Sequence, residues 1–188
     1  TSRLNSLKEF QESFKWGNEG VRTVIEAQES RGKFYGVVAD HILFRLKETA
    51  VEAVLGEKLH YVIVKNQKDG VWAIDYLKNY QLGRGSFIPQ EARNDNGKTS
   101  APIPQEAEPL LQKVSFQDDF RQIADCLLGN VFLIPSIDSG ISLWKKNGFH
   151  GTLVTREGDL LSPQGVLSGG SGAAVEKSLL STKREIFE

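Results

Sequence analysis

The chain has 188 residues, of which 39% are hydrophobic and 25% charged, and it contains 18 glycines and 6 prolines. This composition is ordinary for a globular protein and excludes collagen-like, low-complexity and disulfide-rich classes, while the length allows one large or two small domains. The 23 basic and 24 acidic residues leave a net charge of −1, so no overall basic field favours nucleic acid.

Both ends of the chain show a heptad spacing. Its steps of three and four residues are typical of a coiled-coil seam, although Gly17 and Gly20 weaken the first helix. One amphipathic helix at each end, packed on the domain, would give the same pattern. Because the second pattern runs uncapped to the last residues, we interpret residues 1–30 and 174–188 as antiparallel coiled-coil arms. The seam positions are Leu4, Leu7, Gln11, Phe14, Asn18, Val21 and Ile25, and then Val175, Leu179, Thr182 and Ile186.

The segment 31–89 reads as a first α/β subdomain. A short helix over 50–56 ends on a glycine, and an apolar strand over 61–64 follows it. The next helix carries Val71, Ile74 and Leu77 on one apolar face, before a strand over 85–88.

Residues 90–114 are predicted to form a linker. Four of the six prolines lie at 89, 102, 104 and 109, and the residues between them are polar and rich in turn formers. Prolines break helices and central strands.

The segment 115–173 reads as a second α/β subdomain. Apolar residues at helical spacing over 116–128 end at Gly129, and a strand over 131–134, a helix over 139–146 and a strand over 151–155 follow. Alternation of helices and strands occurs in any α/β protein. In both segments, however, the first helix ends in Leu-Gly (55–56 and 128–129) and an apolar four-residue run follows, which favours a pseudo-repeat of the first subdomain. A hairpin is predicted over 160–168, with its turn at Pro163-Gln164-Gly165.

Short motifs follow one another in a fixed order over nearly the whole chain. In the first half they lie at residues 6–11, 19–22, 34–40, 50–56, 61–64, 73–78, 82–84 and 87–89. In the second half they lie at residues 128–130, 154–159, 162–165, 169–171, 178–180 and 183–186. Together they resemble the hinge domain of bacterial SMC (structural maintenance of chromosomes) proteins. The resemblance is weakest over 90–115, which looks lengthened.

The resemblance implies a hinge that forms a homodimer and closes a ring around chromosomal DNA in chromosome condensation and segregation. It implies no catalysis and no cofactor in this fragment, with ATP and Mg at head domains that this sequence lacks. Regulatory subunits would bind through those heads, and the protein would be cytoplasmic and nucleoid-associated. The absence of methionine fits a fragment of a longer protein. The single cysteine, Cys126, indicates a reducing compartment, and no apolar run approaches the roughly 18 residues that span a membrane.

The resemblance also places the glycine pair Gly169 and Gly170 at the contact between two hinges. Glycines cost roughly 1 kcal/mol each in backbone entropy, so something must need the missing side chains. A turn with positive φ would explain one glycine, whereas close approach of a partner's backbone would explain the pair. On the second hypothesis, replacing Gly169 and Gly170 with glutamate gives a folded monomer. The predicted interface residues are Val166, Leu167, Ser168, Gly169, Gly170 and Gly172.

A DNA-binding module at the junction with the coils is an alternative function. We predict that binding is weak, because Gly172, Ala173, Ala174 and Val175 stand where similar hinges carry lysines, and Glu176 follows them. Fewer phosphate contacts release fewer counterions. Submicromolar binding of a short duplex at about 150 mM salt would contradict this prediction. The candidate contacts are Lys177, Lys183, Arg184, Arg31 and Lys33.

An α/β enzyme that uses the glycine loop 169–172 is a third hypothesis. Glycine-rich turns before helices bind phosphate through free backbone N–H groups. However, Glu176 stands before Lys177 and Ser178, where a carboxylate would repel phosphate, and the spacing fits no P-loop. His41, His60 and His150 stand alone, outside any metal or triad pattern.

Overall fold

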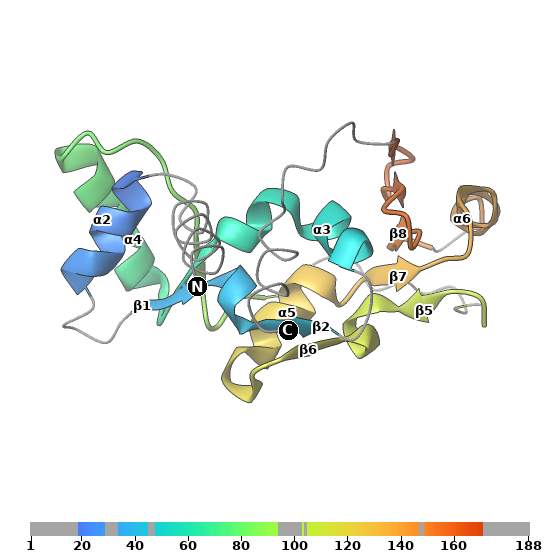
Figure 1. Ribbon diagram of the computed structural model, residues 1–188, viewed down its shortest axis with the longest axis horizontal. Coiled ribbons are helices and arrows are strands. Elements are labelled where there is room, and N and C mark those ends of the chain that lie inside the picture. The colour runs from blue at the N-terminus through green and yellow to red at the C-terminus, as the bar shows by residue number, and fades with distance from the viewer. Residues whose placement is uncertain are drawn as a thin grey trace, which may run out of the picture. The chain divides into compact units, whose positions relative to one another are not determined.

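The computed structural model describes residues 19–28, 34–44, 48–93, 103, 105–146 and 149–170. They form two compact units. Unit 1 contains the described residues of Thr1–His41 and Glu57–Ala92, and unit 2 contains those of Ile42–Gly56 and Arg93–Val175. Each unit combines helices with small sheets, which confirms the predicted mixed α/β class (Figure 1). Of the arms predicted over 1–30 and 174–188, residues 1–18, 29, 30 and 174–188 lie outside the described residues.

Unit 1 is built on a three-stranded sheet in the order β1-β3-β4. Strand β3 pairs antiparallel with β1 and parallel with β4. Parallel neighbours need a crossover connection, and α4 supplies it. The elements are α2 (Glu19–Gln28), β1 (Phe34–Val37), η2 (Val38–His41), η3 (Gly56–His60), β3 (Val62–Val64), α4 (Gln67–Asn79) and β4 (Phe87–Pro89).

Helix α4 does not bury the whole apolar face marked in the sequence. Val71 is 58% exposed and Ile74 is 41% exposed, so of its three residues only Leu77 is buried. The buried face instead runs through Gly70, Ala73 and Leu77. Small side chains at 70 and 73 let α4 lie close to its neighbours, and Ala73 and Leu77 pack with Val24 of α2. Close packing against α2 and against strands β3 and β4 therefore outweighed the larger side chains that flank this face.

Gly20 has a packing role in α2 that its low helix propensity conceals. A Cβ at Gly20 would overlap the carbonyl oxygen of Leu82. Val21 and Ile25, two of the predicted seam positions, are buried, and α2 packs on α4. In the described part of the first arm, α2 thus packs on α4 within unit 1.

Unit 2 is built on a five-stranded sheet in the order β10-β9-β8-β7-β5, beside a two-stranded β2-β6 pair. Strands β7 and β8 are parallel, and the other neighbours in the large sheet are antiparallel. The first elements are β2 (Ile42–Phe44), α3 (Glu48–Leu55), β5 (Glu108–Pro109), η4 (Leu110–Lys113), β6 (Val114–Phe116) and η5 (Asp118–Phe120). The remaining elements are α5 (Arg121–Leu128), β7 (Val131–Leu133), α6 (Ile137–Trp144), β8 (Thr152–Val154), β9 (Leu160–Leu161) and β10 (Leu167–Ser168).

Two parallel strand–helix–strand units, β3-α4-β4 and β7-α6-β8, lie one in each compact unit. Both helices begin at a side-chain cap. Asn66 accepts from the N–H of Asp69, and Ser136 forms a reciprocal capping box with Ser139. This order of elements matches the pseudo-repeat expected from the sequence.

The units differ from the predicted subdomains in two segments. β2 and α3 fall inside the predicted 31–89 subdomain, yet they belong to unit 2. The reason is pairing: β2 runs antiparallel to β6 in the register Ile42–Phe116, and α3 packs on β8.

The last part of the predicted 90–114 linker is structured. Strand β5 pairs with β7, and Ala107, Leu110 and Val114 are buried. Pro109 lies in an edge strand, where a missing N–H is tolerated. Within the described part of the chain, no helix combines the length and hydrophobicity needed to cross a membrane.

Candidate functional site

The hairpin of β9 and β10 forms one edge of the unit 2 sheet, and it contains the predicted interface. β10 pairs with β9 in the register Leu167–Leu161 and Ser168–Leu160. Gly165 closes the turn at φ +85°, and its N–H donates to the carbonyl of Ser162 at 2.9 Å. The predicted hairpin and its turn are therefore present.

Trp144 of α6 contacts the turn of the hairpin at Pro163 and Gly165. Its Nε1–H donates to the carbonyl of Pro163 at 2.9 Å. A Cβ at Gly165 would lie only 2.7 Å from the indole ring, so the ring packs directly against the glycine backbone. The turn is thereby fixed to α6, a role of Trp144 that the sequence did not indicate.

Among the described strands, none pairs with the outer side of β10, and this open edge carries apolar side chains. Val166 is 60% exposed and Leu167 is 54% exposed, whereas their neighbour Leu161 is buried. Ser162 N–H donates to the Val166 carbonyl, and hydrogen-bonded pairs alternate along an antiparallel ladder. The N–H and C=O of Leu167 therefore point away from β9, toward the open edge.

The glycine pair follows β10 directly and contacts Asp159 of the same chain. The N–H of Gly170 donates to Asp159 Oδ1 at 3.2 Å. A Cβ at Gly169 would overlap that same oxygen and lie 2.9 Å from Cγ of Asp159. Gly170 has φ +128°, which disfavours any residue with a side chain. Each glycine thus has a reason for being glycine inside its own subunit. The positive φ of Gly170 is the turn of the first hypothesis, whereas the contact of Gly169 with Asp159 belongs to neither hypothesis.

The structure places only part of the other candidate sites. Gly172, Arg31, Lys33, Lys177, Lys183 and Arg184 lie outside the described residues. In the glycine loop, the Gly170 N–H that a phosphate would need already donates to a carboxylate. This contact weighs against the enzyme hypothesis. Among the described residues, no group of three or more His, Cys, Asp or Glu side chains is placed to hold a metal ion.

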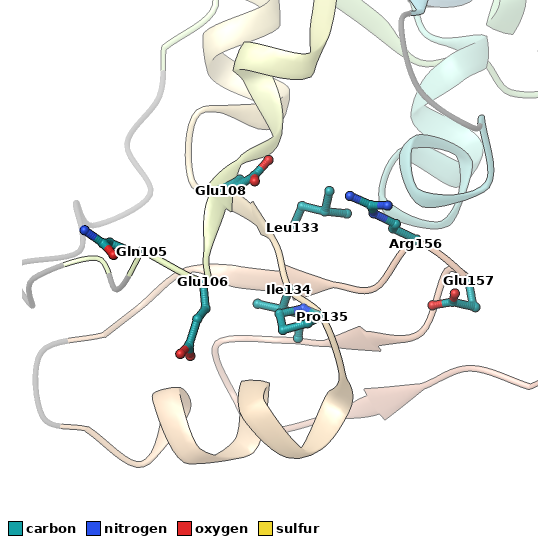
Figure 2. Close-up of a pocket in the computed structure, with 8 residues that line it drawn as sticks. All are labelled: Gln105, Glu106, Glu108, Leu133, Ile134, Pro135, Arg156 and Glu157. Carbon is teal, nitrogen blue, oxygen red and sulfur yellow. The ribbon is translucent and has the colours of Figure 1, made fainter.

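A cavity of about 420 Å³ lies near the end of β7 in unit 2. Leu133, Ile134 and Pro135 provide apolar wall, and Arg156 extends from the β8–β9 turn toward Leu133 (Figure 2). The other lining residues are Gln105, Glu106, Glu108 and Glu157. Three carboxylates against one guanidinium do not suit a phosphate group.

Lys113 holds Glu108 of this cavity in an ion pair of 2.5 Å. The hydrogen bond and charge of Lys113 lower the pKa of Glu108, and Arg156 adds a smaller lowering. Because the folded pKa is depressed, the pair favours folding above the ordinary carboxyl pKa and loses that effect as pH falls through the depressed value.

We predict that Lys113→Gln raises the pKa of Glu108 toward its ordinary value. Removal of Lys113 takes away both of the largest causes of the depression. A carboxyl-detected NMR titration measures the change, with Arg156→Gln as the control that shifts the pKa less. An unchanged Glu108 titration in Lys113→Gln would contradict the ion pair.

The two small α/β units have the architecture of solved hinge domains. A family profile described as "SMC proteins Flexible Hinge Domain" matches residues 31–144. The chain belongs to the SMC hinge family, as the sequence motifs indicated.

The relatives agree with this assignment. The chain is 34% identical over 197 aligned residues to the chromosome partition protein Smc of Myxococcus xanthus. This alignment covers 100% of this chain and 16% of that protein. The SMC hinge domain of Geobacillus stearothermophilus, solved as an asymmetric dimer, matches 99% of this chain and 77% of its own, with 28% identity and a TM-score of 0.78. The Pyrococcus furiosus SMC hinge shares the fold, with 22% identity, 93% coverage of both chains and a TM-score of 0.66.

Proposed function

We propose that this chain is the homodimerising hinge of a chromosome-organising SMC protein and that β10 forms the contact with a second copy. The observation that carries the proposal is the open edge of β10, where Val166 and Leu167 are exposed at the end of a sheet with a buried interior. Open edges attract strands of other chains, and proteins normally cover or blunt them.

The composition of the β10 edge supports a partner strand. No charged side chain and no proline lies between 166 and 170, so the edge lacks the residues that usually prevent edge-to-edge pairing. An added strand would gain main-chain hydrogen bonds and cover two apolar side chains. The Geobacillus hinge was solved as a dimer, which supports a second copy as the partner.

Membership of the family supports a wider function, which we also propose. Dimerised hinges would close a ring that entraps DNA in chromosome condensation and segregation, in the cytoplasm at the nucleoid. The chain spans 16% of the length of its Myxococcus relative. ATP and Mg chemistry and the regulatory subunits would belong to head domains elsewhere in the protein. We propose no catalytic role for this segment.

Sedimentation equilibrium of the 188-residue chain over a dilution series tests the proposal. We expect a homodimer at micromolar concentration that dissociates on dilution. A thermal-shift measurement with ATP is the control for the enzyme hypothesis, and no shift is expected. A chain that remains monomeric at about 100 µM, where even weak specific dimers assemble, would overturn the proposal.

A further inference from the structure

We propose that Asp159 is the positioning residue of the dimer edge: its carboxylate occupies the side-chain space of Gly169 and accepts the N–H of Gly170. The effect on dimerisation rests on the proposed function, because it requires β10 to form the contact. The placement of the carboxylate rests on unit 2 alone. Asp159 and the glycine pair are together called the Asp159 clamp below.

The register of the hairpin brings the two parts of the Asp159 clamp together. Ser168 pairs with Leu160, so Gly169, one residue beyond β10, stands opposite Asp159, one residue before β9. With no Cβ at position 169, the carboxylate lies over the backbone and Oδ1 comes within 3.2 Å of the Gly170 nitrogen. A hydrogen bond to an ionised acceptor is stronger than one between neutral groups.

Asp159 is itself held by the turn that precedes β9. The N–H of Asp159 donates to Thr155 Oγ1 at 3.1 Å, and its carbonyl accepts from the N–H of Thr155 at 2.9 Å. Thr155 is buried. Gly158 turns the chain at φ +94° against Thr49 and Ala53 of α3. The turn therefore presents the carboxylate from a fixed backbone position.

The Asp159 clamp sets the conformation of the chain where β10 ends. Gly170 is held at φ +128°, a conformation that a free backbone would leave for many others. Ordering this segment before the partner arrives reduces the entropy lost on association. The strand edge that pairs with the second copy is thus preorganised by a residue of its own subunit.

The clamp predicts that Gly169 and Asp159 form one energetic unit. Gly169→Ala must displace the carboxylate and break its hydrogen bond to Gly170, and Asp159→Ala removes the same bond. The second substitution should therefore cause little further loss of dimer affinity in the double variant. If Gly169 were glycine only to admit a partner's backbone, the two substitutions would act independently and their effects would add.

A double-mutant cycle on the 188-residue chain tests the clamp. We expect Asp159→Ala and Gly169→Ala each to weaken the dimer by about tenfold, and the double variant to differ from either by no more than about twofold. Asp159→Asn keeps the Oδ1 acceptor but loses its charge, so it should lose clearly less affinity than Asp159→Ala. Urea unfolding of every variant checks that the hairpin still folds.

The amide signal of Gly170 gives a second readout that needs no dimer. In a 15N-labelled chain, this signal should move upfield and exchange faster in Asp159→Ala and Gly169→Ala, and change little in Asp159→Asn. Additive effects in the cycle, an unmoved Gly170 amide in Asp159→Ala, or equal losses in the Asn and Ala variants would each overturn the clamp. If the interface lies elsewhere, dimer affinity stays constant in all variants while the Gly170 amide still moves, which contradicts the proposed function and not the placement of Asp159.

Discussion

Leu167→Pro is expected to convert the chain from a dimer to a folded monomer, weakening self-association by at least about 100-fold. The N–H of Leu167 points to the open edge of β10, where a partner strand would accept it, and proline removes that donor and adds a ring in its place. Because the same N–H makes no bond to β9, proline at 167 is compatible with the hairpin. Sedimentation equilibrium measures the association, and circular dichroism measures the fold.

Leu167→Thr is the matched control for the proline variant. It shortens the same side chain but keeps the N–H and a β-branched residue suited to strands, so dimerisation should survive with a modest loss. A Leu167→Pro chain that stays dimeric at micromolar concentration would contradict the assignment of the contact to β10.

Leu153→Ala is expected to lower the free energy of unfolding of unit 2 by about 2–5 kcal/mol. Leu153 is fully buried on the central strand β8, in a core cluster with Phe132, Leu143 and Leu161. Truncation loses the transfer free energy of its methyl groups and leaves a cavity. Urea denaturation followed by the fluorescence of Trp144, which packs against this cluster, reports the change.

Ile74→Ala is the control for the core substitution. Ile74 is 41% exposed on α4 of unit 1, so its truncation should change the free energy of unfolding far less, by about 0.5 kcal/mol. Equal losses in both variants would contradict the burial pattern, and would instead indicate that the apolar face of α4 is buried.

The order of elements could be predicted from sequence because it depends on local signals. Glycines at helix ends, side-chain caps and short apolar runs mark the ends of the helices and the strands of β3-α4-β4, β7-α6-β8 and the β9–β10 hairpin. The buried face of α4 could not be predicted in the same way. Hydrophobicity favours Val71 and Ile74, but the small residues Gly70 and Ala73 permit the close approach that decides the packing.

The boundaries of the units depend on pairing between distant residues. β2 joins unit 2 because it pairs with β6, more than 60 residues later, and nothing in the segment 42–56 itself marks that partner. The proline-rich composition of 90–114 likewise concealed β5, since an edge strand of two residues accommodates Pro109.

The hairpin that carries the candidate site could be predicted from the sequence, but the contacts of its glycines could not. The hairpin turn at 163–165 fixes the register, and that register places Asp159 opposite Gly169. The pairing could therefore have been read from the sequence. That the carboxylate folds over the glycine and accepts from Gly170 depends on the turn at Thr155, which only the three-dimensional structure reveals.

Hydrogen exchange at the amide of Leu167 tests whether β10 forms the contact between two copies. The Leu167 N–H points to the open edge, so a second copy that adds a strand there should protect it. We predict slow exchange of this amide at concentrations where the chain is dimeric and fast exchange after dilution to monomer, with the Ser168 amide, which faces β9, protected in both. Fast exchange of the Leu167 amide in a fully dimeric sample would contradict the claim that β10 forms the contact.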